Sequence, residues 1–296
     1  MTENIAIHWF RQDLRVSDNP ALTLAAGHGR VLPVYILDDQ NAGEHTMGAA
    51  SRWWLYHSLQ SLNLSLGGVL SLYQGNPADI LGDIAARHDV KAVFWNRCYE
   101  PWRTGRDARI KEHLRAKGIE VESTNGSLLW EPWTIKKNNG DPYKVFTPFY
   151  RKGCLQAEAP REPLPAPGNA HYYKDKQGSL DLEQLQLLPD IRWDKQLEPH
   201  WDIGEQGAHA RFQQFIDEGL ENYKDGRNLP ARPYVSRLSP YLHFGEISPN
   251  RLWHVVRSMG DDNNIDHFCS ELGWREFSYR QLYNNPALPT KNLQPK

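Results

Sequence analysis

The chain has 296 residues, of which 40% are hydrophobic and 24% charged, and its formal net charge is −2. Such a chain is typical of a soluble globular protein with one large or two smaller domains, and its charge excludes attraction to nucleic acid through net charge alone. Three scattered cysteines without a CxxC pair exclude a disulfide framework, and neither they nor the twelve histidines form a convincing metal-ligand cluster. No signal peptide or long apolar run is present, which predicts a cytoplasmic protein.

Short β-rich runs alternate with helical stretches in the first part of the chain. The expected strands are Ile5–Phe10, Val31–Leu37, Val69–Tyr73, Lys91–Asn96 and Ile119–Ser123. Helical stretches follow Ser17 and Pro20, cover Ala49–Leu66, and begin near Pro77 and near Arg106. This alternation predicts an α/β fold with a parallel sheet covered on both faces. Neither GxGxxG nor GxxxxGK[ST] occurs, so a dinucleotide fingerprint and a P-loop are both excluded.

The end of the first expected strand carries charged residues, in the stretch FRQDLRVSDNP. Ligands of open α/β sheets sit beyond the carboxyl ends of strands, so Arg11, Asp13 and Arg15 are candidates for a site. A loop that is internally charge-paired is the commoner meaning of this pattern, and we favour it here.

The pattern changes between about Leu129 and His200. The proline-rich segment Pro160–Gly168 cannot form regular structure, and the polar residues after it predict a long connection over a surface or between domains. After Trp201 apolar residues recur at helical spacing, which predicts an all-α second half.

The stretch PYVSRLSPYLHFGEIS, residues 233–248, combines a helix start with extra hydrogen-bond donors. Ser239 before Pro240 predicts a serine cap on a helix N-terminus. Ser236 and Arg237 lie just ahead of it, where a hydroxyl and a guanidinium could hold a phosphate. These residues alone favour a capped helix with a surface arginine; the anion site is the alternative.

Several segments together resemble the DNA photolyase/cryptochrome family, most closely its bacterial cyclobutane pyrimidine dimer photolyases. IHWFRQDLRVSDNPAL resembles the opening strand and loop of that family, YKVFTPFYR its inter-domain link, and SRLSPYLHFGEISP and ELGWREFSYRQLYNNP the front half of its flavin domain. The resemblance implies an α/β, Rossmann-like antenna domain over residues 1–131, a linker over 132–200, and the N-terminal part of an all-α FAD- and DNA-binding domain over 201–296.

The resemblance also implies a flavin site. In the family, the segment aligned with residues 235–239 wraps the diphosphate of FAD, which assigns Val235, Ser236, Arg237, Leu238 and Ser239 to the cofactor. Tyr223, Phe268 and Arg275 are assigned to it as well. Val235 replaces the threonine that the family usually has, and the loss of one hydroxyl donor weakens the site by about 1–2 kcal/mol.

The segment ELGWREF carries the residues closest to the implied chemistry. Glu271, Trp274 and Arg275 stand at i, i+3 and i+4, which predicts one shared helix face. The resemblance assigns Glu271 and Trp274 to catalysis, through contact with a flipped-out dimer, and Arg275 to the flavin or the DNA backbone. It assigns Arg227 to a DNA phosphate. Without the resemblance, Glu271, Trp274 and Arg275 equally fit a Glu–Arg salt bridge beside a core tryptophan. Tyr223 and Arg227 equally fit a contact between residues i and i+4 of a helix.

The implied function is that of a deoxyribodipyrimidine photo-lyase, a carbon–carbon lyase in which light-driven electron transfer from reduced FAD splits cyclobutane pyrimidine dimers in UV-damaged DNA. Two alternatives stay open. One is a cryptochrome-type blue-light receptor, and the other is a remnant that neither binds FAD nor repairs DNA. No membrane or metal is implied.

The flavin domain of the family continues beyond the point that matches Lys296, which predicts a C-terminally truncated, incomplete helical domain and self-association through an exposed apolar face. The family also holds antenna chromophores. A folate-type pattern has Asn-Glu where this chain has Trp102-Arg103, while His45 and Met47 are compatible with folate; a folate and a deazaflavin both stay open.

Overall fold

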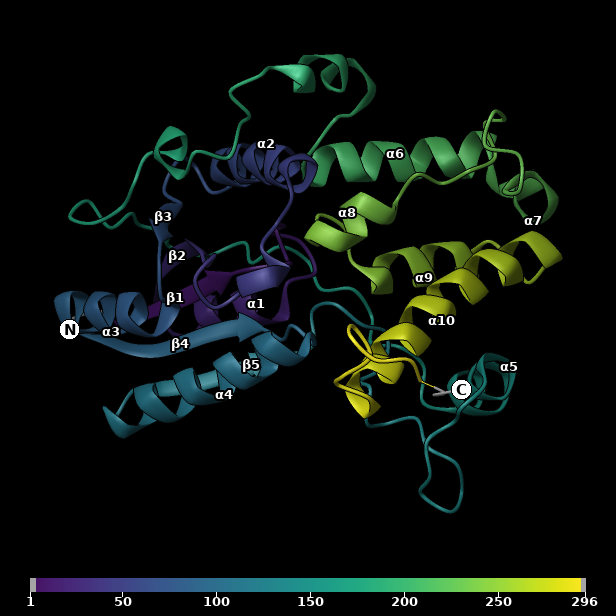
Figure 1. Ribbon diagram of the computed structural model, residues 1–296, viewed down its shortest axis with the longest axis horizontal. Helices are drawn as coiled ribbons and strands as arrows, with labels where there is room; N and C mark the ends of the chain where they lie inside the picture. Colours follow the sequence, from purple (N-terminus) through teal and green to yellow (C-terminus); the bar gives the residue numbers. More distant parts are fainter. Residues whose placement is uncertain (1–3, 294–296) are drawn as a thin grey trace.

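The computed structural model describes residues 4–293, so the outermost ends of the expected first and last domains lie outside the described residues. Its centre is a five-stranded parallel sheet in the order β3-β2-β1-β4-β5 (Figure 1). The strands are β1 (Ile5–Phe10), β2 (Arg30–Leu37), β3 (Ser71–Gln74), β4 (Val90–Asn96) and β5 (Glu120–Thr124). The predicted parallel α/β sheet is confirmed, with each strand within two residues of its expected bounds.

Helices cover both faces of this sheet, as the alternation predicts. They are α1 (Pro20–His28), α2 (Ala49–Ser65), α3 (Pro77–His88) and α4 (Pro101–Ala116). Ile7 and Trp9 of β1 pack in the cluster that α3 and α4 complete, whereas Ala6 and Phe10 pack with α1 and α2. The alternation of strand side chains between two faces explains this division. Helix α4 begins at Pro101 rather than near Arg106, because proline suits the first helical turn.

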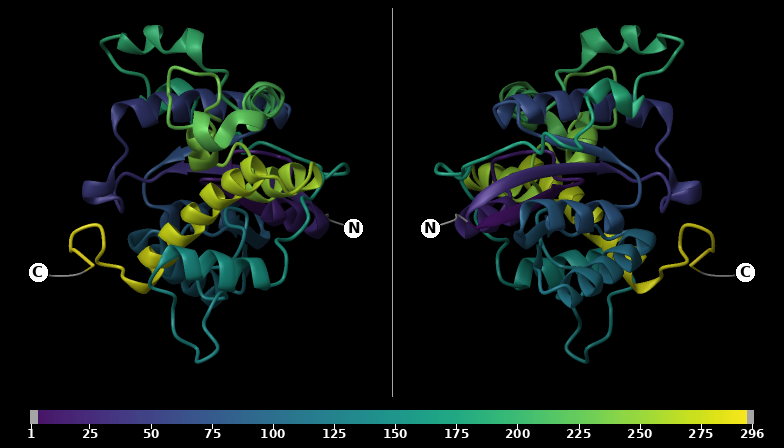
Figure 2. Two further views of the ribbon diagram at one scale, coloured as in Figure 1. Left: turned by 90° about the vertical axis from the view of Figure 1, so that its right-hand side faces the viewer. Right: turned by 90° about the vertical axis from the view of Figure 1, so that its left-hand side faces the viewer.

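The segment that links the sheet to the later helices runs along the sheet edge. It contains α5 (Phe146–Pro148) and several short helical turns, and isolated bridges pair Tyr172 with Val31 and Leu180 with Leu72. Buried Asp175 accepts a hydrogen bond of 2.5 Å from the Tyr73 hydroxyl. The predicted irregular connection is therefore present, and it is fixed to β2 and β3. Figure 2 shows it from two further sides.

The second half is helical, as expected. Its helices are α6 (Glu205–Glu218), α7 (Tyr223–Gly226), α8 (Ser239–Phe244), α9 (Pro249–Ser258) and α10 (Asn263–Asn284). Caps that the sequence prescribes start two of them: Ser248 accepts from the Arg251 N–H at 3.0 Å, and Asp262 accepts from the N–H groups of Asn264 and Ile265. In the part of the chain that is described, no helix combines the length and apolar character needed to cross a membrane.

Two carboxylates, one half-buried and one buried, join the helical region to the α/β part. Glu205 of α6 accepts from the backbone N–H groups of Val16 at 2.7 Å and Ser17 at 2.9 Å. Glu276 of α10 accepts from those of Leu129 at 3.0 Å and Trp130 at 3.2 Å. These contacts hold α6 and α10 against the chain segments that follow β1 and β5, beside the carboxyl ends of the strands (Figure 1).

Candidate functional site

A pocket of about 370 Å³ lies between α8 and α10, and we call it the α8/α10 pocket. Seven of the predicted site residues line it: Tyr223, Ser236, Leu238, Ser239, Phe268, Glu271 and Arg275. Five further residues line it that the sequence reasoning did not select: Leu242, His243, Leu252, Leu272 and Tyr279. The helical spacing of positions 268, 272, 275 and 279 would have found those on α10.

The loop before α8 has a specific backbone conformation. Arg237 adopts a left-handed φ of 55°, which changes the direction of the backbone between Ser236 and Leu238. The guanidinium of Arg211 donates 3.0 Å hydrogen bonds to the carbonyl oxygens of Val235 and Ser236 and so fixes the loop. The Arg237 guanidinium lies 4.3 Å from the Trp201 ring centroid, and neither Arg237 nor Val235 lines the pocket.

The predicted capping role of Ser239 is wrong. Helix α8 begins at Ser239, the cap position is Leu238, and no side chain makes a capping hydrogen bond. Leu238 already has helical backbone angles, which places Ser239 inside the first turn. Its exposed hydroxyl is thereby left at the pocket wall.

Arg275 provides a fixed positive charge on the opposite wall. Its Nη1 donates to the Ser127 carbonyl oxygen at 2.7 Å, and the guanidinium lies 5.0 Å from the ring centroid of Tyr279. The neighbouring Glu276 carboxylate approaches the same nitrogen at 3.2 Å. Burial raises the pKa of Glu276 to about 7. These contacts restrain Arg275, which lines the pocket.

Glu271 and Arg227, which the sequence assigned to separate partners, form an ion pair with each other. Both side chains are about one-third exposed, at 31% and 28%. The Arg227 guanidinium also lies 5.7 Å from the ring centroid of Tyr223, so the i,i+4 contact is present as well.

Trp274 does not line the α8/α10 pocket with Glu271 and Arg275, although their spacing predicts one shared helix face. Trp274 lies about 60° to one side of Glu271 around the helix and Arg275 about 40° to the other, and of the two only Arg275 lines the pocket. The Trp274 ring stacks on Phe146 with centroids 3.7 Å apart and planes 12° apart, and 45% of the residue is exposed. The stack lies outside the residues that line the pocket.

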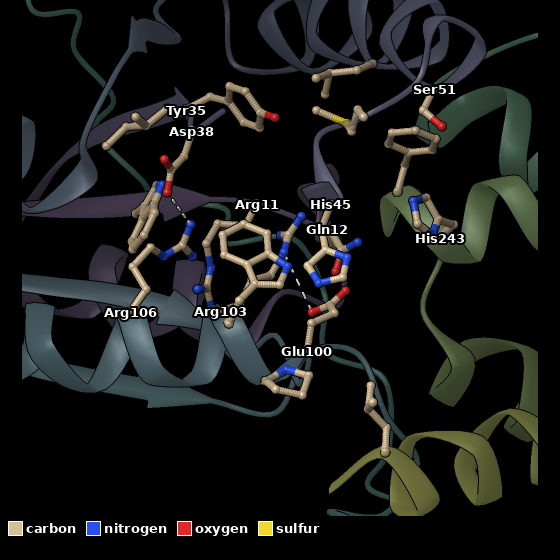
Figure 3. Close-up of a pocket in the computed structure, with 18 of the residues that line it drawn as sticks. Arg11, Gln12, Tyr35, Asp38, His45, Ser51, Glu100, Arg103, Arg106 and His243 are labelled. Carbon is tan, nitrogen blue, oxygen red and sulfur yellow. Dashed lines mark hydrogen bonds and ion pairs between the residues drawn. The ribbon is translucent and has the colours of Figure 1, made fainter. Parts of the chain in front are cut away.

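A second pocket, of about 350 Å³, lies at the carboxyl ends of β1 and β2 (Figure 3), and we call it the strand-end pocket. This is the place where the strand order reverses, between β1 and β4, and where open α/β sheets bind ligands. Arg11, Arg103, Arg106, Asp38 and Glu100 contribute charges to it, and His45 and Met47 also line it. His243 borders both pockets.

The charges of the strand-end pocket are largely paired. Arg106 binds Asp38 at 2.9 Å, Arg11 pairs with Asp107, and Arg103 lies 3.7 Å from Glu100. Trp102 and Arg103 line the pocket, so the carboxylate that a folate-type pattern has at this position is absent, as the sequence indicates. Asp38 and Glu100 supply two carboxylates to the pocket from other positions. The loop after β1 is charge-paired, as expected, but with residues of β1 and α4: Asp13 pairs with His8 and Arg11 with Asp107. Burial would raise the pKa of Asp13, but contacts with His8, the Arg11 backbone N–H and Asn96 together outweigh it and hold the pKa at about 2.

Comparisons with known proteins agree with one another. Residues 6–168 match the family model described as DNA photolyase. The chain is 40% identical to the deoxyribodipyrimidine photo-lyase of Agrobacterium fabrum, over 97% of this chain and 60% of that protein. It is 34% identical to Cryptochrome-2 of Arabidopsis thaliana, over 97% of this chain and 50% of that protein.

Comparison with solved structures also indicates the photolyase family. The structure of a bacterial class III photolyase from Agrobacterium tumefaciens is similar with a TM-score of 0.92 at 38% identity, over 99% of this chain and 62% of that one. The chain thus spans about 60% of the length of these photolyases.

Proposed function

Because the chain belongs to the DNA photolyase family, we propose that its α8/α10 pocket binds FAD and that it acts as a deoxyribodipyrimidine photo-lyase on UV-damaged DNA. The single observation that carries the proposal is the convergence of seven expected site residues on one pocket. In this proposal residues 1–131 form the antenna domain, 132–200 the linker, and 201–296 belong to the FAD- and DNA-binding domain.

The pocket has the chemistry that a flavin diphosphate needs. The hydroxyls of Ser236 and Ser239 make no hydrogen bond within residues 4–293, so both are available to a phosphate. Arg275 adds a positive charge, and Leu242, Leu252 and Phe268 provide apolar surface for a ring system. In the proposed assignment Leu238 contacts the cofactor at the pocket wall, and Val235 and Arg237, which do not line the pocket, act by shaping the loop that presents Ser236.

The residues around the pocket have separate roles in repair. A bound reduced flavin supplies the electron that opens the cyclobutane ring when light excites it. Glu271 binds the edge of a flipped-out pyrimidine, and Trp274 packs against it. Arg227 holds a DNA phosphate, and the apolar wall excludes water, which strengthens each polar contact.

We propose a second, light-harvesting chromophore for the strand-end pocket. Arg103, which lies 3.7 Å from its carboxylate partner Glu100, suits an anionic group, and the ring of Trp102 provides a flat apolar surface. Asp38 and Glu100 are acceptors for ring N–H groups of a folate-type or deazaflavin chromophore. A released chromophore other than FAD tests this assignment.

One assay separates the proposed function from two alternatives. A cryptochrome-type receptor, favoured by the likeness to Cryptochrome-2, binds flavin without repairing DNA, and a remnant does neither. The assay follows repair of a dimer-containing oligonucleotide under blue light, with dark incubation as the control. Glu271→Ala is expected to slow repair, and Asp266→Ala on the same helix serves as the matched control. Equal repair by wild type and Glu271→Ala removes the role assigned to Glu271.

A further inference from the structure

We propose that the Arg227–Glu271 ion pair couples the two DNA contacts: a phosphate that binds Arg227 releases Glu271 to bind the base. This inference rests on the proposed function, because it concerns the order of contacts with the same DNA. Arg227 is in this account a positioning residue for Glu271 as well as a phosphate ligand.

The geometry makes the two contacts compete. The pair joins Arg227, which follows α7, to Glu271 at the middle of α10, on the rim of the α8/α10 pocket. Both side chains are partly exposed, so an incoming strand reaches them without unfolding any element. While the pair is closed, the carboxylate neutralises the guanidinium, and the guanidinium occupies the acceptor that a pyrimidine edge would use.

A phosphate changes this balance electrostatically. Phosphate and carboxylate carry like charges, and both cannot approach one guanidinium without repulsion. An exposed ion pair contributes little free energy, so one phosphate suffices to open it. The ring of Tyr223, 5.7 Å from the guanidinium, keeps Arg227 at the rim when the carboxylate leaves.

The consequence is an ordered recognition. Undamaged DNA opens the pair but offers no flipped-out base to Glu271, so it gains only the phosphate contact. A dimer that has left the stack gains both contacts. The cost of opening the ion pair therefore lowers the affinity for both kinds of strand, and only a dimer offsets it, through the contact with the released Glu271.

The test uses undamaged oligothymidylate and needs neither flavin nor light, so its result stays readable if flavin binding or repair fails. Dissociation constants are measured by fluorescence anisotropy at several salt concentrations for wild type, Glu271→Gln, Arg227→Gln and the double variant. Asp266→Asn is the matched control, since it removes one charge from α10 and opens the ion pair with Arg257.

Glu271→Gln is expected to tighten binding about twofold to fivefold, the equivalent of an exposed ion pair, and Asp266→Asn less. The gain should vanish in the Arg227→Gln background, and Arg227→Gln should reduce the salt slope by about one. Equal gains for Glu271→Gln and Asp266→Asn overturn the proposal. So does a gain that persists without Arg227, or no binding by any variant at low salt.

Discussion

The Oε2 atom of Glu246 accepts a 3.0 Å hydrogen bond from the indole N–H of Trp54, and this contact joins the turn after α8 to α2. The other oxygen accepts from Ser58 at 2.5 Å, and Glu246 itself is fully buried. A carboxylate at this position connects the pocket-forming helices to the α/β part, and its protonation state therefore affects how firmly they are held.

Burial raises the pKa of Glu246 from 4.5 to about 7. A raised folded-state pKa favours the folded protein below pH 4.5, and this contribution is lost as pH rises through 7. The loss amounts to about 3 kcal/mol at most. Glu246→Gln should remove this part of the pH dependence. Chemical denaturation at pH 5 and pH 8 measures it, with exposed Glu44→Gln as control; equal pH slopes in wild type and Glu246→Gln contradict the assignment.

Gly245 permits the closest approach between α8 and the loop after β1. Its φ is 71°, and a Cβ there would collide with the carbonyl oxygen of Gln12. Gly245→Ala should therefore lower the free energy of unfolding by at least about 2 kcal/mol. Gly168→Ala, in open space, should change it by less than about 0.5 kcal/mol. Similar urea midpoints for the two variants would show that the backbone at Gly245 does not lie as close to the Gln12 carbonyl oxygen as this account requires.

Local patterns in the sequence predict the fold well. The apolar runs place each strand within two residues, and Pro20 and Pro77 are the first residues of α1 and α3. Strand signals depend on neighbours a few residues apart, which is why one sequence is enough to find them, whereas the cap predicted at Ser239 is not formed.

Contacts between residues that are far apart in the sequence cannot be predicted in this way. Glu246 looks like a surface residue in a turn, and only the fold brings it to Trp54, 192 positions earlier. The spacing predicts that Trp274 lies with Glu271 at the pocket, but in the fold its ring stacks on Phe146 outside the pocket. The ion pair of Glu271 with Arg227 is likewise a product of tertiary packing, because no local spacing pairs them.

Ser236 should contribute a hydrogen bond to the proposed flavin diphosphate. Ser236→Ala is expected to weaken FAD binding about tenfold, which corresponds to about 1.4 kcal/mol. Flavin fluorescence quenching during titration of the chromophore-free protein gives the dissociation constant. Ser65→Ala on the exposed side of α2 is the control. An unchanged constant for Ser236→Ala would remove this residue from the site.

Trp274 should act on damaged DNA through its exposed ring. Trp274→Ala is expected to cost about 1–3 kcal/mol in binding to a dimer-containing oligonucleotide and much less for the undamaged one. Trp274→Phe keeps an aromatic ring beside Phe146 and should retain most of the difference. If Trp274→Ala weakens both oligonucleotides alike, the ring has no part in recognising damage.

The most direct test of the account is the visible absorption spectrum of the purified protein, with the released chromophore identified after denaturation. The account predicts one flavin per chain, released as FAD, and a lower flavin content in Ser236→Ala. A colourless protein that also fails to take up added FAD would contradict it.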